Sequence, residues 1–302
     1  MIKKLFPAFG TINSISISGD RNLSILEHIR KRMMQMHHFF SFFNSESDIS
    51  KINEQAGIHP VAVNEDTFYL LSLARNYAKE TKGAFDVTAG SMSELWRNAI
   101  HSGILPSKAE IEYCRAHCDI QNLELDKAHG TAFLKKKGMK LDLGGIVKGY
   151  AADEARSMLQ VYNIQNAQIN FGGTVVVIGR SQKIGIQNPF QKTGKTMVSI
   201  QLKNKAIVTS GSYEQCFFHQ GKRFHHIIDP RTGMPSCSGL ISVSLIGDEA
   251  AKLDALATGI CSLGQEAGMS VVRRHGISAI FVTDSGSVQI TPELQGKISF
   301  DS

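Results

Sequence analysis

A carboxylate and a hydroxyl stand four residues apart in the segment Asp254-Ala-Leu-Ala-Thr258. Residues at this spacing lie on one face of a helix, so their oxygens can approach one point. Such a hard-oxygen pair suits Mg²⁺, with phosphate oxygens and water completing its shell. The commoner alternative is a Thr hydroxyl bonded only to its own helix. We expect Asp254 in the first turns of its helix, where the dipole also stabilises negative charge.

A glycine pair lies in Leu141-Asp-Leu-Gly-Gly-Ile-Val-Lys-Gly-Tyr150, where a strand is expected to end and a helix to begin. Backbone N–H groups at such a junction are exposed, and a ligand can approach the main chain closely. The segment has neither the GxGxxG pattern of dinucleotide sites nor the Lys-Ser/Thr ending of a P-loop. A tight turn without a ligand explains this segment, taken alone, equally well.

Two further segments combine polar residues and glycines that are not needed to form a hydrophobic core. In His225-His-Ile-Ile-Asp-Pro-Arg-Thr-Gly233 a strand pattern runs into a turn, and a His, an Asp and an Arg stand together. These could be a base and a phosphate contact, or a hydrogen-bonded strand His and a turn-capping Asp. In Gly83-Ala-Phe-Asp-Val-Thr88 the Phe could lie against a flat ring. The only tryptophan, Trp96, follows and is predicted to be core.

Composition narrows the class of protein. The chain has 302 residues, 42% hydrophobic and 20% charged, which is typical of a globular protein. A net charge of +6 favours an anionic partner, but no Lys/Arg run alternates with aromatic residues, so we expect no nucleic acid partner. No apolar window reaches membrane-spanning length, so we expect no membrane span.

Five cysteines give no even disulfide framework, which indicates a reducing compartment. The N-terminus lacks a signal-peptide pattern, and we predict a cytoplasmic location.

Hydrophobic periodicity places helices and strands in a mixed order. Because no regular strand–helix–strand alternation occurs, we predict an α+β fold in a single domain spanning 1–302. Asp20 is expected to cap the first helix. Helices are predicted over about 20–42, 64–80, 107–118, 148–159, 250–263 and 265–275. Strands are predicted over 11–18, 167–178, 183–187, 198–202, 206–209, 241–246 and 279–283, with a hairpin inside 123–143.

Taken together, these segments resemble the ApbE-type flavin transferases. The matching pieces occur in the order of that family and cover roughly residues 9 to 265. They are Phe40-Ser-Phe-Phe-Asn-Ser-Glu-Ser-Asp-Ile-Ser-Lys-Ile-Asn53, Gly83 to Thr88, Leu141 to Gly149, Asn170-Phe-Gly-Gly173, Thr209-Ser-Gly-Ser-Tyr213, His226 to Gly233 and Asp254 to Thr258.

The resemblance implies an ApbE-like fold with mainly antiparallel strands and a ligand site in a cleft between two lobes. It implies an FAD:protein FMN transferase that cleaves the FAD pyrophosphate, releases AMP and joins FMN by a phosphoester to a Thr or Ser of an acceptor protein. It implies Mg²⁺ held by the Gly145 carbonyl, the Asp254 carboxylate and the Thr258 hydroxyl. His226 would be the base on the acceptor hydroxyl, with Asp254 also catalytic. Contacts to FAD would come from Phe9, Phe43, Ala84, Phe85, Asp86, Asp142, Lys148, Ile228 and Ala257.

The chain departs from the usual pattern of that family at three positions. Phe43 stands where Tyr is more frequent, Phe9 where Met is common, and Gln215 where Arg is usual. Many such proteins are periplasmic lipoproteins, so the missing export signal indicates a cytoplasmic member or a shortened chain. Two other functions remain open: a magnesium-dependent FAD pyrophosphatase with water as acceptor, and a flavin-binding or scavenging protein without turnover.

Overall fold

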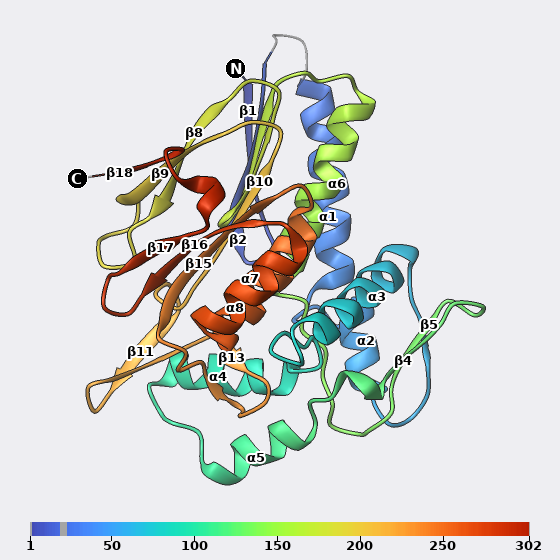
Figure 1. Cartoon of the computed structure of the whole chain (residues 1–302). Helices are drawn as coiled ribbons and strands as arrows, with labels where there is room; N and C mark the ends of the chain where they lie inside the picture. The colour runs from blue at the N-terminus through green and yellow to red at the C-terminus, as the bar shows by residue number, and fades with distance from the viewer. Residues whose placement is uncertain (1, 19–22, 302) are drawn as a thin grey trace.

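An antiparallel sheet of eight strands forms the centre of the molecule, in the order β1-β2-β6-β7-β10-β15-β16-β17 (Figure 1). The computed structural model describes residues 2–18 and 23–301. The sheet strands are β1 (Ile2–Ala8), β2 (Thr11–Ile17), β6 (Ala167–Phe171), β7 (Thr174–Ile178), β10 (Ala206–Gly211), β15 (Leu240–Gly247), β16 (Ser278–Thr283) and β17 (Val288–Ile290). With helices packed against antiparallel strands, the predicted α+β class is confirmed.

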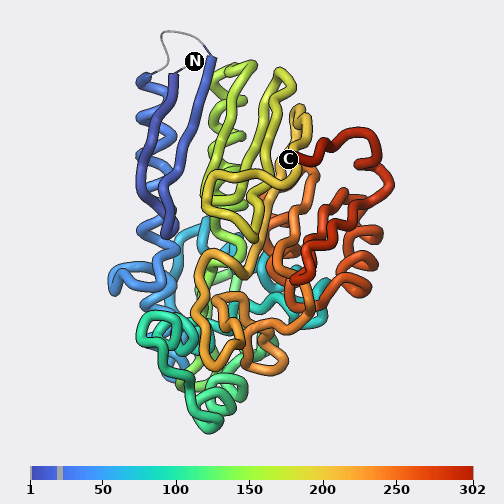
Figure 2. The backbone as a smooth tube through the Cα atoms, turned by 90° about the vertical axis from the view of Figure 1, so that its left-hand side faces the viewer, coloured from blue at the N-terminus to red at the C-terminus, as the bar shows by residue number. Residues whose placement is uncertain are grey.

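One face of this sheet is covered by helices, and β7, β10, β15, β16 and β17 are covered on the other face as well. Four helices pack on one face: α1 (Leu23–Phe40), α6 (Val147–Val161), α7 (Ala250–Leu263) and α8 (Gln265–His275). On the other face lies a small sheet of β8 (Gln182–Gln187), β9 (Thr196–Leu202) and β18 (Ile298–Phe300). Figure 2 looks onto the sheet, whose strands are spread from β1 and β2 (blue) at the left to β16 and β17 (red) at the right. Because β15 is covered on both faces, every residue of this strand is buried, and it lacks the alternation of a half-exposed strand.

A second group of short elements lies at one end of this layered body (Figure 1). Local capping defines several of them: Ser47 and Asn64 accept backbone N–H groups at the starts of two helices, and Ser107 with Glu110 forms a capping box. The helices are α2 (Asp48–Glu54), α3 (Glu65–Glu80), α4 (Gly90–Ser102) and α5 (Lys108–Ala116), with the 3₁₀ turn η1 (Ile120–Asn122). The other 3₁₀ turn, η2 (Pro292–Leu294), belongs to the layered body and contacts β16. The strands are β3 (Val61–Ala62), β4 (Leu123–Asp126), β5 (Thr131–Leu134), β11 (Cys216–His219), β12 (Lys222–His225), β13 (Ile228–Asp229) and β14 (Met234–Pro235).

The structure corrects several boundaries predicted from the sequence. The expected strand over 167–178 is a hairpin, because Gly172 and Gly173 adopt positive φ angles of 54° and 89° and turn the chain. The first helix ends at Phe40 rather than 42, where the Ser41 hydroxyl accepts backbone N–H groups of the next residues. The strand β1 and the helices α2 and α4 were not predicted. Asp20, the expected cap, lies outside the described residues.

Helices α6 and α7 cap one another. The Asp153 carboxylate of α6 accepts the N–H groups of Ala250 and Ala251 at 3.0 and 2.9 Å, at the start of α7. The Asp254 carboxylate of α7 accepts the N–H of Gly149 at 2.9 Å, in the first turn of α6. First-turn N–H groups have no partner inside their own helix, so each carboxylate satisfies donors of the other helix. This exchange fixes how far one helix can slide along the other.

Gly149 allows this contact. A Cβ added at Gly149 would lie 2.2 Å from the carbonyl oxygen of Ala250, a backbone atom that cannot swing away. We therefore expect Gly149→Ala to lower the free energy of unfolding by about 1–3 kcal/mol, the usual cost of overpacking. Helix preference alone predicts the opposite sign, about 1 kcal/mol in favour of Ala. Urea unfolding of this variant beside Gln160→Ala, on the exposed side of the same helix, decides between the two; a more stable Gly149→Ala would contradict the close contact.

Candidate functional site

Oxygen atoms from three elements converge where α6 begins. The Thr258 hydroxyl on α7 donates to the carbonyl of Asp254 at 3.0 Å and lies 3.5 Å from the carbonyl oxygen of Gly145. The hydroxyl of Ser210, at the end of β10, lies 3.4 Å from the same Thr258 oxygen. The structure therefore brings Gly145, Asp254 and Thr258 together, although 113 positions separate the first from the last.

Asp254 is the fifth residue of α7, within the first turns of the helix, as expected from the sequence. Its side chain is buried, at 3% exposure. The N-terminus of α6, rather than that of its own helix, stabilises its charge through the Gly149 N–H. The ammonium of Lys148 lies 3.9 Å from Oδ2 of Asp254, the oxygen that accepts the Gly149 N–H.

These residues fit a magnesium ion. The hydrogen bond from Gly149 uses Oδ2 of Asp254, and no hydrogen bond among the described residues uses Oδ1. A Cβ at Gly145 would stand 3.1 Å from the Thr258 hydroxyl, so the glycine keeps the space between these oxygens open. The donors are a carboxylate, a hydroxyl and a carbonyl, which are the ligands of hard cations. Within 2–18 and 23–301 no three His, Cys, Asp or Glu side chains gather as a metal cluster, so a His- or Cys-rich zinc site is not offered there.

His226 follows strand β12 and lies near enough to Lys148 for the lysine charge to act on its ring. The strand β12 ends at His225, so the expected strand position of His226 is wrong. The Nδ1 atom of His226 is 3.3 Å from the carbonyl oxygen of Gln215. A carbonyl only accepts, so we assign the proton of the neutral ring to Nδ1, which leaves a lone pair on Nε2. Burial lowers the pKa of His226 below its ordinary value, and the positive charge of Lys148 lowers it further.

His225 differs from its neighbour. Its ring is buried and its Nε2 lies 3.1 Å from the carbonyl of Ser236, while burial lowers its pKa to about 4. This ring therefore stays neutral at physiological pH and holds two chain segments together. It presents no exposed lone pair to a substrate.

Among the expected FAD contacts, Phe85 and Asp142 lie nearest to the glycine turn. The Phe85 ring is 3.3 Å from the position of a Cβ at Gly145. Asp142 accepts the N–H of Gly144 at 2.8 Å and so shapes the turn from within. Lys148 bonds the carbonyl of Gly144 at 2.9 Å. Together these contacts hold the turn that presents the Gly145 carbonyl.

The remaining expected contacts lie further from the oxygen group or are buried. Ala84 and Ala257 have 1% and 0% exposure, and Ile228, at 8%, packs with Trp96 in a separate small core. The Asp86 carboxylate accepts N–H groups of Thr88 and Ile120, and its burial raises its pKa.

Two aromatic residues occupy loops at the edge of the structure. Phe43, 80% exposed, lies between α1 and α2. Phe9 has a φ of 53° in the two-residue turn between β1 and β2, which is unusual for a bulky side chain. Its ring packs edge-on against His37 at 5.6 Å and near Phe171 at 6.4 Å. No direct contact joins either ring to the oxygen group among the described residues.

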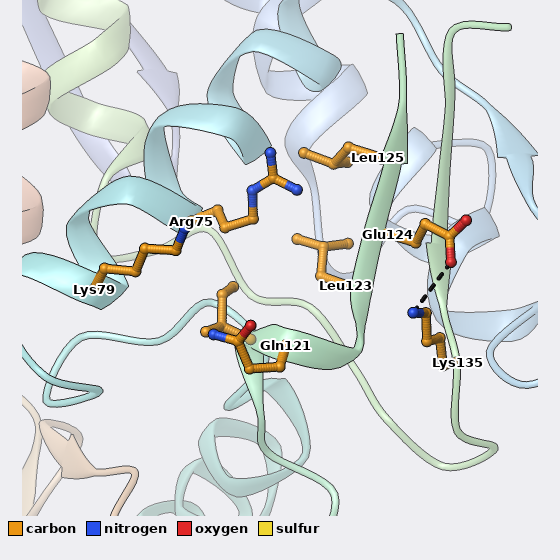
Figure 3. Close-up of a pocket in the computed structure, with 8 residues that line it drawn as sticks. Arg75, Lys79, Gln121, Leu123, Glu124, Leu125 and Lys135 are labelled. Carbon is orange, nitrogen blue, oxygen red and sulfur yellow. Dashed lines mark ion pairs between the residues drawn. The ribbon is translucent and has the colours of Figure 1, made fainter. Parts of the chain in front are cut away.

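The cavities identified on the surface lie elsewhere. One of about 260 Å³ opens between α3 and the β4–β5 hairpin (Figure 3). Arg75 and Lys79 point toward it over a floor of Leu123 and Leu125. Another of about 270 Å³ lies beyond the C-terminal end of α6. Neither is lined by an expected site residue, and the predicted cleft between two lobes stays a prediction.

Comparison with known proteins identifies the family. The model of the ApbE family matches residues 9–281. The chain belongs to the ApbE family. An FAD:protein FMN transferase of Klebsiella pneumoniae is 37% identical over 245 residues, 81% of this chain and 77% of its own length. One of Treponema pallidum is 30% identical over 276 residues, 85% of this chain and 76% of its own length.

Solved structures agree with this family assignment. An ApbE protein from Thermotoga maritima superposes with a TM-score of 0.89 at 32% identity, over 98% of both chains. A His-to-Gly variant of the flavin transferase ApbE from Vibrio cholerae gives 0.85 at 26% identity, over 98% of this chain and 99% of its own. In the described part of the chain, no helix has the length and apolarity to cross a membrane. All five cysteines are free.

Two residues of this region were not singled out from the sequence. Ser210 falls in the matched Thr209–Tyr213 segment, and its closeness to Thr258 comes from the approach of β10 to α7. Arg97 comes from the unpredicted helix α4 and pairs with Asp142 at 2.7 Å. Only the fold reveals this pair, because 45 positions separate its members.

Asp254 serves the fold as well as the site, which leads to a stability prediction. Asp254→Ala leaves the buried Gly149 N–H without its acceptor and should lower the free energy of unfolding by about 1–3 kcal/mol. Asp254→Asn keeps a carbonyl oxygen at that point and should cost less. Chemical denaturation of both variants measures the difference; equal stabilities would contradict the capping role.

Proposed function

We propose that this chain is an FAD:protein FMN transferase that acts at the N-terminus of α6. The observation that carries the proposal is the grouping of one carboxylate, one hydroxyl, one glycine carbonyl and one lysine at that helix end, beside a His with a lowered pKa. The names of the related transferases support the same activity. A single domain covering 1–302 is part of the proposal.

Gly145, Asp254 and Thr258 would hold Mg²⁺. When bound, the ion neutralises charge on the phosphate oxygens of FAD. The chain adds fixed positive potential at the same place, since Lys148 and the first-turn N–H groups of α6 point there. Phosphoryl transfer depends mainly on positioning and charge neutralisation, and this arrangement offers both.

His226 is the proposed base. Nε2 takes the proton of the acceptor Thr or Ser hydroxyl while its oxygen bonds to the FMN phosphorus. The bond from that phosphorus to the bridging oxygen breaks, and AMP leaves with that oxygen. Since the Nδ1 proton bonds to the Gln215 carbonyl, the lone pair of Nε2 would be free to accept the proton of the hydroxyl.

The two alternatives share most of this site. A pyrophosphatase would use water in place of the protein hydroxyl, and a scavenging protein would bind flavin without turnover. Binding alone does not require a base, which favours an enzyme. Incubation with FAD and Mg²⁺, with and without an acceptor peptide containing Thr, separates the three: a flavin-fluorescent peptide supports transfer, free FMN without labelled peptide supports hydrolysis, and unchanged FAD supports binding alone. The cytoplasmic location predicted from the sequence stays a prediction.

Removal of the metal should stop the reaction. We expect transfer to need Mg²⁺ or Mn²⁺ and to fail with Zn²⁺, because all proposed ligands are oxygens. Asp254→Asn should abolish turnover, whereas Glu266→Gln, an exposed acid on the adjacent helix α8, should behave as wild type. Rates measured during a metal titration after chelation test this. Full activity in metal-free buffer would show that the metal site is wrong.

His226→Asn should slow single-turnover labelling of an acceptor peptide by about 10²–10⁴, the usual contribution of a general base. FAD binding should be nearly unchanged. Since the lowered pKa keeps His226 neutral to lower pH, the wild-type rate should fall only below about pH 6.5, the ordinary value. That acidic limb should be absent in His226→Asn.

Two controls accompany this measurement. His219→Asn, on the neighbouring strand β11, should keep the wild-type rate. His225→Asn should reduce stability, because its ring is buried, but leave the rate per folded molecule close to wild type. Equal rate losses at His225 and His226, or a loss at His226 explained wholly by weaker FAD binding, would remove the base assignment.

A further inference from the structure

Arg97, on α4, ties the aromatic loop between α1 and α2 to the body of the protein. Its guanidinium carbon lies 4.6 Å from the ring centre of Phe42 and 5.1 Å from that of Phe43. The two rings meet edge to face at 5.3 Å. A guanidinium within about 6 Å of an aromatic ring is attracted to it. The highly exposed Phe43 ring is therefore held in place by Arg97.

The same guanidinium also reaches the glycine turn. Nη1 donates to Oδ2 of Asp142 at 2.7 Å, and Oδ1 of Asp142 accepts the N–H of Gly144 at 2.8 Å. The side chains of Arg97 and Asp142 are 30% and 15% exposed, so this pair is less screened by water than a surface pair. One side chain thus connects Phe43, Asp142 and the turn that carries Gly145.

One hydrogen-bond donor of the Arg97 side chain is left unsatisfied in this position. Its Nη2 atom is buried and has no hydrogen-bond partner among the described residues. An unpaired buried donor is unfavourable, and such groups are rare in folded proteins. The Asp142 carboxylate and the rings of Phe42 and Phe43 hold the side chain in this position, although Nη2 then has no hydrogen-bond partner among the described residues. A local cost of this kind is typical of functional regions.

We propose that Arg97 is a positioning residue for FAD. It holds the exposed ring of Phe43, against which a planar ring system can lie, at a fixed place relative to the Asp142 carboxylate. Both oxygens of that carboxylate keep further lone pairs, which can accept an N–H of the ligand. The inference rests on the proposed function in one respect, that FAD is the ligand.

The test is the dissociation constant of FAD, measured by flavin fluorescence titration with Mg²⁺ and without acceptor. Arg97→Met should weaken binding about 10- to 100-fold, because FAD binding must then order the side chains of Phe43 and Asp142 that Arg97 holds in the wild type. Arg97→Lys should recover part of the affinity, since it keeps a cation but not the planar fork. Arg30→Met is the matched control: Arg30 is also 30% exposed and paired, to Glu27, on α1. It should bind FAD as wild type does.

A double-mutant cycle tests whether Arg97 acts through Asp142. Arg97→Met should weaken FAD binding much less in an Asp142→Asn background, because contacting residues show non-additive effects. Unchanged affinity in Arg97→Met, or losses that simply add, would overturn the proposal. If Arg97→Met does not fold, wild-type affinity in Arg97→Lys would overturn it.

The outcomes also separate this inference from the proposed function. A wild-type protein that binds FAD but labels no acceptor refutes transfer and leaves the role of Arg97 to be decided by the affinities. A wild-type protein that does not bind FAD overturns both.

Discussion

The close crossing of α6 and α7 is the constraint on which the site depends. Two carboxylates, Asp153 and Asp254, each satisfy N–H groups at the start of the opposite helix, and Gly149 lets the backbones meet. Since the Gly145 turn leads directly into α6 and Thr258 stands one turn beyond Asp254 on α7, fixing the two helices also fixes the distance between their oxygens. The spacing of these oxygens therefore follows mainly from how two core helices pack.

The sheet contributes in a different way. At β10 both faces of the sheet are covered, and Ser210 reaches the side of Thr258 from this strand rather than from a loop. By contrast, the aromatic residues expected to meet the flavin lie on turns at the edge, Phe9 in a strained hairpin turn and Phe43 in an exposed loop. Oxygen ligands on rigid elements and aromatic surfaces on loops suit a ligand with a charged centre and flat ends.

Local sequence patterns were sufficient to predict some helices and part of the candidate site. The other elements depend on tertiary packing, which the sequence does not display. The helices at 250–263 and 265–275 were predicted with their observed bounds, because their apolar residues recur at helical spacing and Gly264 separates them. Because the first of these helices was predicted, the four-residue spacing of Asp254 and Thr258 could be interpreted as one helix face. The helix α4 begins at Gly90 without a side-chain cap, so no local signal marks its start. Gly90 is required by tertiary packing, because a Cβ at this position would lie 2.6 Å from the carbonyl oxygen of Lys140.

Lys148 illustrates why composition and motif alone do not define a mechanism. A carboxylate near a His usually favours the protonated ring, yet here Lys148 lies 3.9 Å from the Asp254 carboxylate, and its positive charge acts on His226 as well. The lysine charge compensates the carboxylate and at the same time opposes protonation of the His, as burial does. In the proposed function, this one lysine would supply positive potential for the diphosphate of FAD and help to keep the proposed base uncharged.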